Sequence, residues 1–211
     1  MPKQTALLVI DMQRDFCDPR GYAGQAGMDV NVLRRPIPAI QALLDAARAQ
    51  SMMVIHTREG HRPEILDCHP SKRRRSLRAG AEIGSQGPLG RLLIRGEYGH
   101  DIIDELQPAP GEVVVDKPGY GAFYQTDLEL LLRASGIENL VLTGVTTDVC
   151  VHSTLREAVD RGFNCITVSD GCAAGDPALH EAALQTILGE GHIFGEVATS
   201  AEVLAQWSAR P

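Results

Sequence analysis

The segment that decides the fold covers residues 139–169 and reads NLVLTGVTTDVCVHSTLREAVDRGFNCITVS. Its first part, 139–143, is an apolar run typical of a buried strand, and Gly144 ends that run. Apolar side chains then recur at helical spacing over about 148–161 and stop at a glycine. A second β-branched run follows at 165–169. A strand, a helix and a strand in this order predict two parallel strands joined by a crossover helix.

The same alternation continues on both sides of this segment. Further strand-like runs lie at residues 6–10, 52–56 and 112–116, with a short sixth strand expected near 193–194. Helices are expected at about 36–50, 126–135 and 177–189. In the second of these, Thr126 is the expected N-cap and Glu129 completes a capping box. We therefore expect an α/β fold with three α/β/α layers around a central, mostly parallel six-stranded sheet, in a single domain over residues 1–211.

The composition excludes several classes of protein. Of the 211 residues, 44% are hydrophobic and 22% are charged, and the formal net charge is −7. This acidic balance argues against general binding to nucleic acid or to an anionic membrane, because both need a basic face. No apolar run reaches the roughly 18 residues of a membrane span, so a cytoplasmic protein is expected. Five cysteines without a C-x-x-C pair predict free thiols rather than a disulfide framework.

Three chemically useful residues follow predicted strands, where open parallel sheets bind their ligands. Asp11 follows the first strand, Lys117 the third, and Cys150 lies just beyond the fourth, at the start of a helix. A thiol near a helix N-terminus is favoured as thiolate by the helix dipole, and an ammonium group would stabilise it further. A carboxylate could accept the thiol proton and return it to a leaving amine. The sequence therefore predicts a nucleophile, a charge stabiliser and an acid/base group.

Three motifs carry a resemblance to a known family. Residues 8–16 (LVIDMQRDF), 116–123 (DKPGYGAF) and 144–151 (GVTTDVCV) resemble the motifs of isochorismatase-like cysteine hydrolases, and the likeness runs over about residues 5–200. The resemblance implies that Cys150 is the nucleophile, Asp11 the general acid/base and Lys117 their ion-pair partner. It also implies a cis peptide between Val145 and Thr146. The backbone N–H groups of Thr146 and Cys150 would then form the oxyanion hole.

Within the family, the sequence is most similar to enzymes that act on small ureides. Residues 56–63, 71–76 and 99–106 resemble segments of biuret and triuret hydrolases, ureidoacrylate amidohydrolases and N-carbamoylsarcosine amidases. The resemblance implies hydrolysis of a C–N bond of a small linear ureide of the biuret or triuret type, with release of ammonia through an acyl-enzyme. Phe16 and Phe123 would wall the pocket. Glu190 stands where biuret hydrolases have Gln, and we expect it to accept hydrogen bonds from the ureide N–H groups, with an acid on the surface at a helix end as the alternative.

Between about residues 60 and 112 the pattern of strands and helices is weak, and the segment is long for a connection between two strands. This predicts an excursion of the chain away from the sheet that serves the function. It contains the basic run at residues 72–75, which reads KRRR. We expect this run to be a lid or a contact between subunits, with a solvated loop as the alternative. Members of the family commonly assemble as dimers or tetramers, so the resemblance also implies a homo-oligomer.

No cofactor is expected, and a metal is not part of the predicted chemistry. Glu59, His61 and His69 are the residues that could hold zinc or manganese. Three other functions remain open. The protein could be a ureidoacrylate or N-carbamoylsarcosine type of amidase, or a nicotinamidase-like amidase. It could also be a redox-sensing thiol module, with Cys165 or Cys172 as the resolving cysteine.

Overall fold

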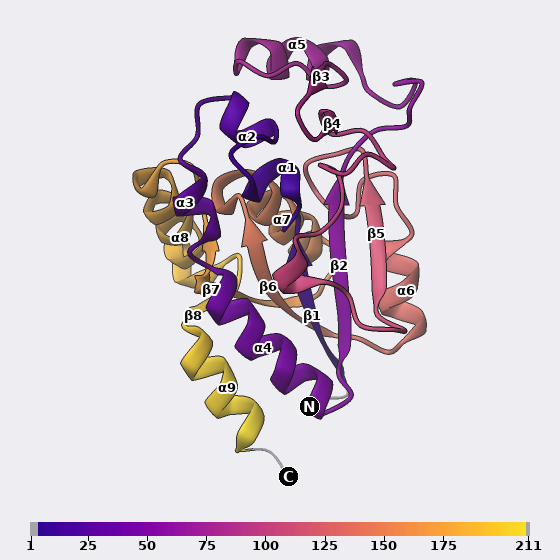
Figure 1. The fold of residues 1–211 in the computed structure, drawn as a ribbon. Coiled ribbons are helices and arrows are strands. Elements are labelled where there is room, and N and C mark those ends of the chain that lie inside the picture. The colour runs from indigo at the N-terminus through magenta and orange to yellow at the C-terminus, as the bar shows by residue number, and fades with distance from the viewer. Residues whose placement is uncertain (1–3, 210–211) are drawn as a thin grey trace.

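The fold is built on one six-stranded sheet, whose strands are labelled in Figure 1. The computed structural model describes residues 4–209. The strand order is β5-β2-β1-β6-β7-β8, and all neighbours in it are parallel. The strands are β1 (Thr5–Ile10), β2 (Met53–Glu59), β5 (Val113–Lys117), β6 (Asn139–Val145), β7 (Asn164–Ala173) and β8 (Glu196–Ala198). The predicted α/β fold is confirmed, and the sheet is parallel throughout rather than mostly so.

Helices cover both faces of this sheet. Because successive residues of a strand point to opposite faces, Leu7 and Val9 belong to one core cluster and Leu8 and Ile10 to the other. The first cluster packs under α3 (Val30–Arg34), α4 (Ile37–Ala49) and α9 (Ser200–Ser208). The second packs under α6 (Leu128–Ala134), α7 (His152–Asp160) and α8 (Pro177–His192). Helices of the described residues thus cover both faces of the sheet, as is usual for parallel sheets.

Several local predictions need correction. Helix α6 begins at Leu128, and the expected capping box at Thr126 is absent, because the Thr126 hydroxyl accepts instead from the Leu128 N–H at 3.3 Å. The chain after β6 first makes a π-helical turn, η3 (Thr147–Val151), and only then enters α7. The sixth strand lies at Glu196–Ala198 rather than at 193–194. The backbone leaves helical geometry at Gly189–Gly191, and the chain enters the strand only after this irregular end of α8.

The excursion between β2 and β5 covers the carboxyl ends of the strands (Figure 1). It contains α5 (Pro70–Arg78), the short hairpin β3 (Gln86–Gly87) and β4 (Gly90–Arg91), and the 3-10 turn η2 (Asp104–Leu106). On the same side, between β1 and α3, lie α1 (Arg14–Cys17) and α2 (Tyr22–Gln25). In the part of the chain that is described, no helix has the length and apolar character needed to cross a membrane.

The close approach of β6 to β1 depends on a glycine. Gly144 has φ of +112°, and a Cβ at this position would lie 2.0 Å from the carbonyl oxygen of Ile10. We therefore expect Gly144→Ala to lower the free energy of unfolding by about 3 kcal/mol or more, measured by urea denaturation. Gly136→Ala is the control, since its φ is also positive but its Cβ would meet nothing within 4 Å. Equal losses in the two variants would show that the contact with Ile10 is not the cause.

Candidate active site

Four side chains from four strand ends meet under the excursion. Asp11 directly follows β1, and the last residues of β2 and β5, Glu59 and Lys117, are partners in the strand register. Cys150 lies in η3, just after β6. The carboxylate oxygens of Asp11 and Glu59 and the sulfur of Cys150 all lie within 4.8 Å of one another. The structure thus brings together the three residues predicted from sequence, and it adds Glu59, which the sequence suggested only as a metal ligand.

Lys117 is the buried cation of the site. Its Nζ lies 2.8 Å from Asp11 Oδ2 and 3.6 Å from Glu59 Oε2. It also donates to the carbonyl oxygens of Gly119, at 3.0 Å, and Tyr120, at 2.8 Å. Burial alone would lower the pKa of Lys117, but the acidic groups of Asp11, Cys150 and Glu59 together outweigh it and hold that pKa above its ordinary value. Lys117 therefore remains charged and fixed.

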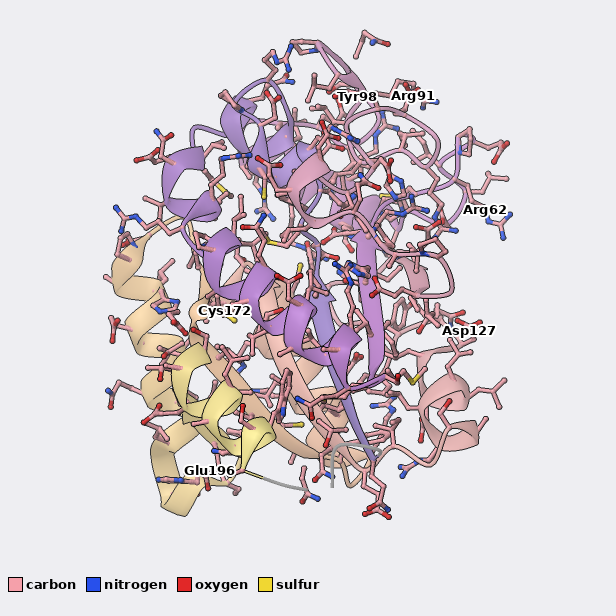
Figure 2. All side chains as sticks on the ribbon, turned by 60° about the horizontal axis from the view of Figure 1, so that its bottom comes forward. Arg62, Arg91, Tyr98, Asp127, Cys172 and Glu196 are labelled. Carbon is pink, nitrogen blue, oxygen red and sulfur yellow. The ribbon has the colours of Figure 1, made fainter. Side chains whose placement is uncertain are left out.

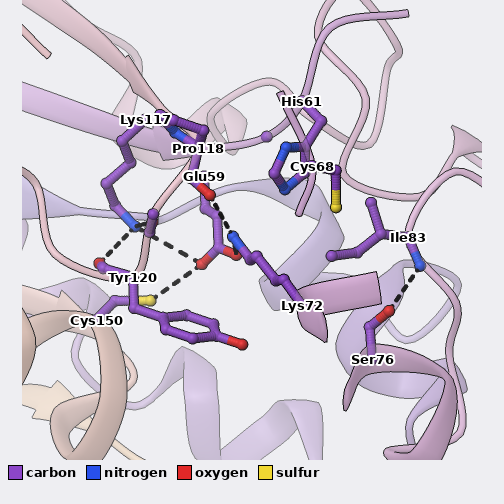
Figure 3. Close-up of polar contacts among 12 residues, drawn as sticks. Glu59, His61, Cys68, Lys72, Ser76, Ile83, Lys117, Pro118, Tyr120 and Cys150 are labelled. Carbon is purple, nitrogen blue, oxygen red and sulfur yellow. Dashed lines mark hydrogen bonds and ion pairs between the residues drawn. The ribbon is translucent and has the colours of Figure 1, made fainter. Parts of the chain in front are cut away.

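The thiol of Cys150 is neutral in this arrangement. Its Sγ donates to Glu59 Oε2 at 3.2 Å (Figure 3). Burial raises the pKa of Cys150 well above its ordinary value, and the opposing effect of Lys117 is smaller. This corrects the expectation that the helix terminus and Lys117 would favour a thiolate, because desolvation by full burial is the largest effect. The thiol must therefore lose its proton as it attacks.

The two carboxylates differ as bases. Burial raises the pKa of Asp11, whose Oδ1 accepts a hydrogen bond from the Thr57 hydroxyl at 2.7 Å. Burial would also raise the pKa of Glu59, but Lys72 and Lys117 outweigh this and lower it to about 2. A group with a higher pKa is the stronger proton acceptor. Of the two, Asp11 is thus the better base for the thiol proton, while Glu59 stays charged.

The first residue of the basic run at 72–75 is not solvated, contrary to the alternative of a solvated loop. Lys72 is buried, its Nζ lies 2.6 Å from Glu59 Oε1, and it also donates to the Pro118 carbonyl oxygen at 2.6 Å (Figure 3). The three arginines that follow it are exposed. The sequence held no signal for this difference, because the two buried residues of α5, Lys72 and Ser76, are polar, whereas its leucine, Leu77, is exposed.

A cavity of about 230 Å³ opens above the thiol. Cys150, Thr146 and Phe16 line it, and the peptide bond between Val145 and Thr146 is cis. The assignment of the oxyanion hole to the N–H groups of Thr146 and Cys150 stays a prediction.

Two predicted substrate-binding residues lie elsewhere. Phe123 is a core residue, with its ring centroid 5.9 Å from that of Phe163, so it does not wall the cavity. Glu190 is exposed at the end of α8, which runs from the carboxyl edge of the sheet back to its amino edge. Figure 2 shows Glu196, at the start of β8, at this lower edge, far from Arg91 and Tyr98 in the excursion. The pocket wall expected from Phe123 and the ureide contact expected from Glu190 are therefore corrected.

The residues present do not favour a metal. His69 caps α5 at the surface, with its Nδ1 2.8 Å from the Ser71 hydroxyl, and does not join Glu59. His61 is buried, with Nδ1 3.4 Å from Asp67 Oδ1. Over residues 4–209, the group of potential ligands that converges is Asp11, Glu59 and Cys150. Its two carboxylates already face the ammonium groups of two lysines, which would repel a divalent cation.

Fold and site together define a cysteine hydrolase, and the chain belongs to the isochorismatase family. The profile of the isochorismatase domain matches residues 5–202. The ureidoacrylate amidohydrolase RutB of Serratia proteamaculans (strain 568) is 36% identical over 195 residues, which cover 88% of this chain and 77% of the relative.

Solved structures agree with this assignment. A cysteine hydrolase from Pseudomonas syringae pv. phaseolicola 1448A superposes with a TM-score of 0.84 at 31% identity, covering 99% of this chain and 94% of that one. N-carbamoylsarcosine amidase from Thermoplasma acidophilum gives a TM-score of 0.70 at 26% identity, with 93% and 96% covered. The predicted family and the predicted class, a hydrolase of carbon–nitrogen bonds, are confirmed. The finer resemblance to biuret and triuret hydrolases stays a prediction.

The charge of Glu59 should set the acidity of the nucleophile. Because its carboxylate raises the pKa of Cys150, we expect Glu59→Gln to shift that pKa downward. The measurement is the rate of iodoacetamide alkylation at Cys150 as a function of pH, followed by mass spectrometry of the Cys150 peptide. Glu82→Gln is the control, since Glu82 pairs with Arg73 at 2.8 Å, outside the cavity. A midpoint that stays unchanged or rises in Glu59→Gln would contradict this electrostatic account.

Proposed function

We propose that the protein is an amidohydrolase that cleaves the terminal C–N bond of a small ureido compound and releases ammonia through an acyl-enzyme on Cys150. The observation that carries this proposal is the placement of the Cys150 thiol in the cavity wall, with the Lys117–Asp11 pair beneath it. Nucleophile, proton acceptor and charge stabiliser are then within reach of one bound carbonyl group.

The proposed reaction follows from the protonation states of the site. As the sulfur of Cys150 attacks the ureide carbonyl carbon, its proton passes to Asp11, the stronger of the two bases. The oxyanion forms next to the N–H groups of Thr146 and Cys150. When this intermediate collapses, the C–N bond breaks and Asp11 returns the proton to the leaving ammonia. Water then hydrolyses the thioester, giving a carbamate and the free thiol.

The substrate is proposed from the relatives and from the sequence. The named relatives above are a ureidoacrylate amidohydrolase and an N-carbamoylsarcosine amidase. Both names describe a carbamoyl group attached to nitrogen, next to a carboxylate. We therefore place substrates of this type ahead of biuret and triuret, which the sequence motifs alone favoured. All of them present the same terminal carbamoyl group to the thiol.

Removing the nucleophile should abolish turnover and leave the fold intact. We expect Cys150→Ser to release no ammonia from ureidoacrylate, N-carbamoylsarcosine, biuret, triuret or nicotinamide, whichever of them the native protein hydrolyses. Circular dichroism and thermal unfolding would show that the variant is folded. Cys172→Ser is a matched control, because Cys172 is also buried but its thiol faces the Leu142 carbonyl oxygen at 3.7 Å. Ammonia release that persists in Cys150→Ser would exclude the covalent route.

A further inference from the structure

The charges in the cavity wall do not cancel. Three charged side chains line it: Glu59, Lys72 and Arg75. Glu59 and Lys72 form an ion pair at 2.6 Å and neutralise each other. Over residues 4–209, no carboxylate lies within 4 Å of the Arg75 guanidinium. In the described part of the protein, the cavity therefore carries one positive charge that has no ion-pair partner within 4 Å.

Arg75 belongs to the single face of α5 that meets the cavity. The residues of this segment that line it are Lys72, Arg75, Ser76 and Ala79, at the i, i+3, i+4 and i+7 spacing of one helical face. Two other arginines of the run do not line it, and one of them, Arg73, pairs with Glu82 at 2.8 Å. The basic run thus presents one lysine and one arginine to the cavity, and the lysine is already neutralised.

Tyr120 connects Arg75 to the reacting thiol. The Arg75 Nε donates to the Tyr120 hydroxyl at 3.5 Å, and its guanidinium carbon lies 5.9 Å from the centroid of that ring. The Tyr120 ring lies beside Cys150 and lines the same cavity (Figure 3). Arg75 keeps its other N–H donors for a ligand, and a guanidinium matches the two oxygens of a carboxylate.

We propose that Arg75 binds a carboxylate of the substrate and selects anionic ureido acids over neutral ureides. This inference rests on the proposed function and specifies its substrate class. A molecule with its carbamoyl group at Cys150 and its carboxylate at Arg75 would lie along the Tyr120 ring. Its negative charge would compensate the free guanidinium. A neutral ureide such as biuret would leave Arg75 unpaired.

The test compares two ureides of similar size, 3-ureidopropionate and the neutral N-(3-hydroxypropyl)urea, by ammonia release. We expect the native protein to prefer the carboxylate. In Arg75→Gln, kcat/KM for 3-ureidopropionate should fall about 10- to 100-fold, mainly through KM, because a charged hydrogen-bonded pair is lost. The neutral urea should change little. Arg75→Lys should retain part of the preference, and Arg74→Gln, the adjacent exposed arginine outside the cavity wall, should match the native protein.

The outcomes separate this inference from the proposed function. Equal losses on both substrates in Arg75→Gln, or no loss on 3-ureidopropionate, would overturn the role of Arg75. Hydrolysis of ureides that needs Cys150 but shows no preference for a carboxylate would overturn it as well, while the proposed function would stand. If neither ureide is hydrolysed, the proposed function loses its support. The carboxylate site at Arg75 is then tested by whether 3-ureidopropionate protects Cys150 from iodoacetamide. Protection by 3-ureidopropionate that disappears in Arg75→Gln supports the carboxylate site, and no protection of the native protein overturns it.

Discussion

The balance of buried charge around Cys150 is the constraint on which the site depends. Taking an ion out of water costs several kcal/mol, and removing one partner of a buried pair typically costs about 3–5 kcal/mol. Here Asp11 and Glu59 face Lys117 and Lys72, so two negative and two positive groups cancel. A thiolate would add an unmatched negative charge. The resting nucleophile is therefore a thiol, and the base with the raised pKa lies within reach of it.

The sheet and the reacting residues could be predicted because both follow from local pattern. β-branched runs marked the five long strands, and the rule that parallel sheets bind ligands at their carboxyl ends selected Asp11, Lys117 and Cys150. The resemblance added the bond between Val145 and Thr146, which is cis in the structure. The capping box at Thr126 was wrong because a hydroxyl can satisfy more than one backbone group, and sequence spacing does not say which.

The less predictable part was the contact between distant segments. Glu59 and Lys72 are 13 positions apart in the sequence, and no local sequence pattern shows that their side chains form an ion pair. Phe123 was expected at the pocket because it belongs to the lysine motif, yet its ring turns into the core toward Phe163. Glu190 was assigned by analogy of position, and the direction of α8 takes it to the opposite edge of the sheet. Tertiary packing decided all of these.

The reacting groups and the proposed selecting group come from different kinds of structure. Asp11, Lys117 and Cys150 lie at or just beyond the carboxyl ends of strands of the central sheet, whose backbone pairing positions these ends. Arg75 lies on α5, a surface helix with only two buried residues. Related genes can therefore diverge in this helix with little cost to the chemistry, provided that the lysine anchoring it is kept. The architecture allows one reaction to be inherited while its substrates change between lineages.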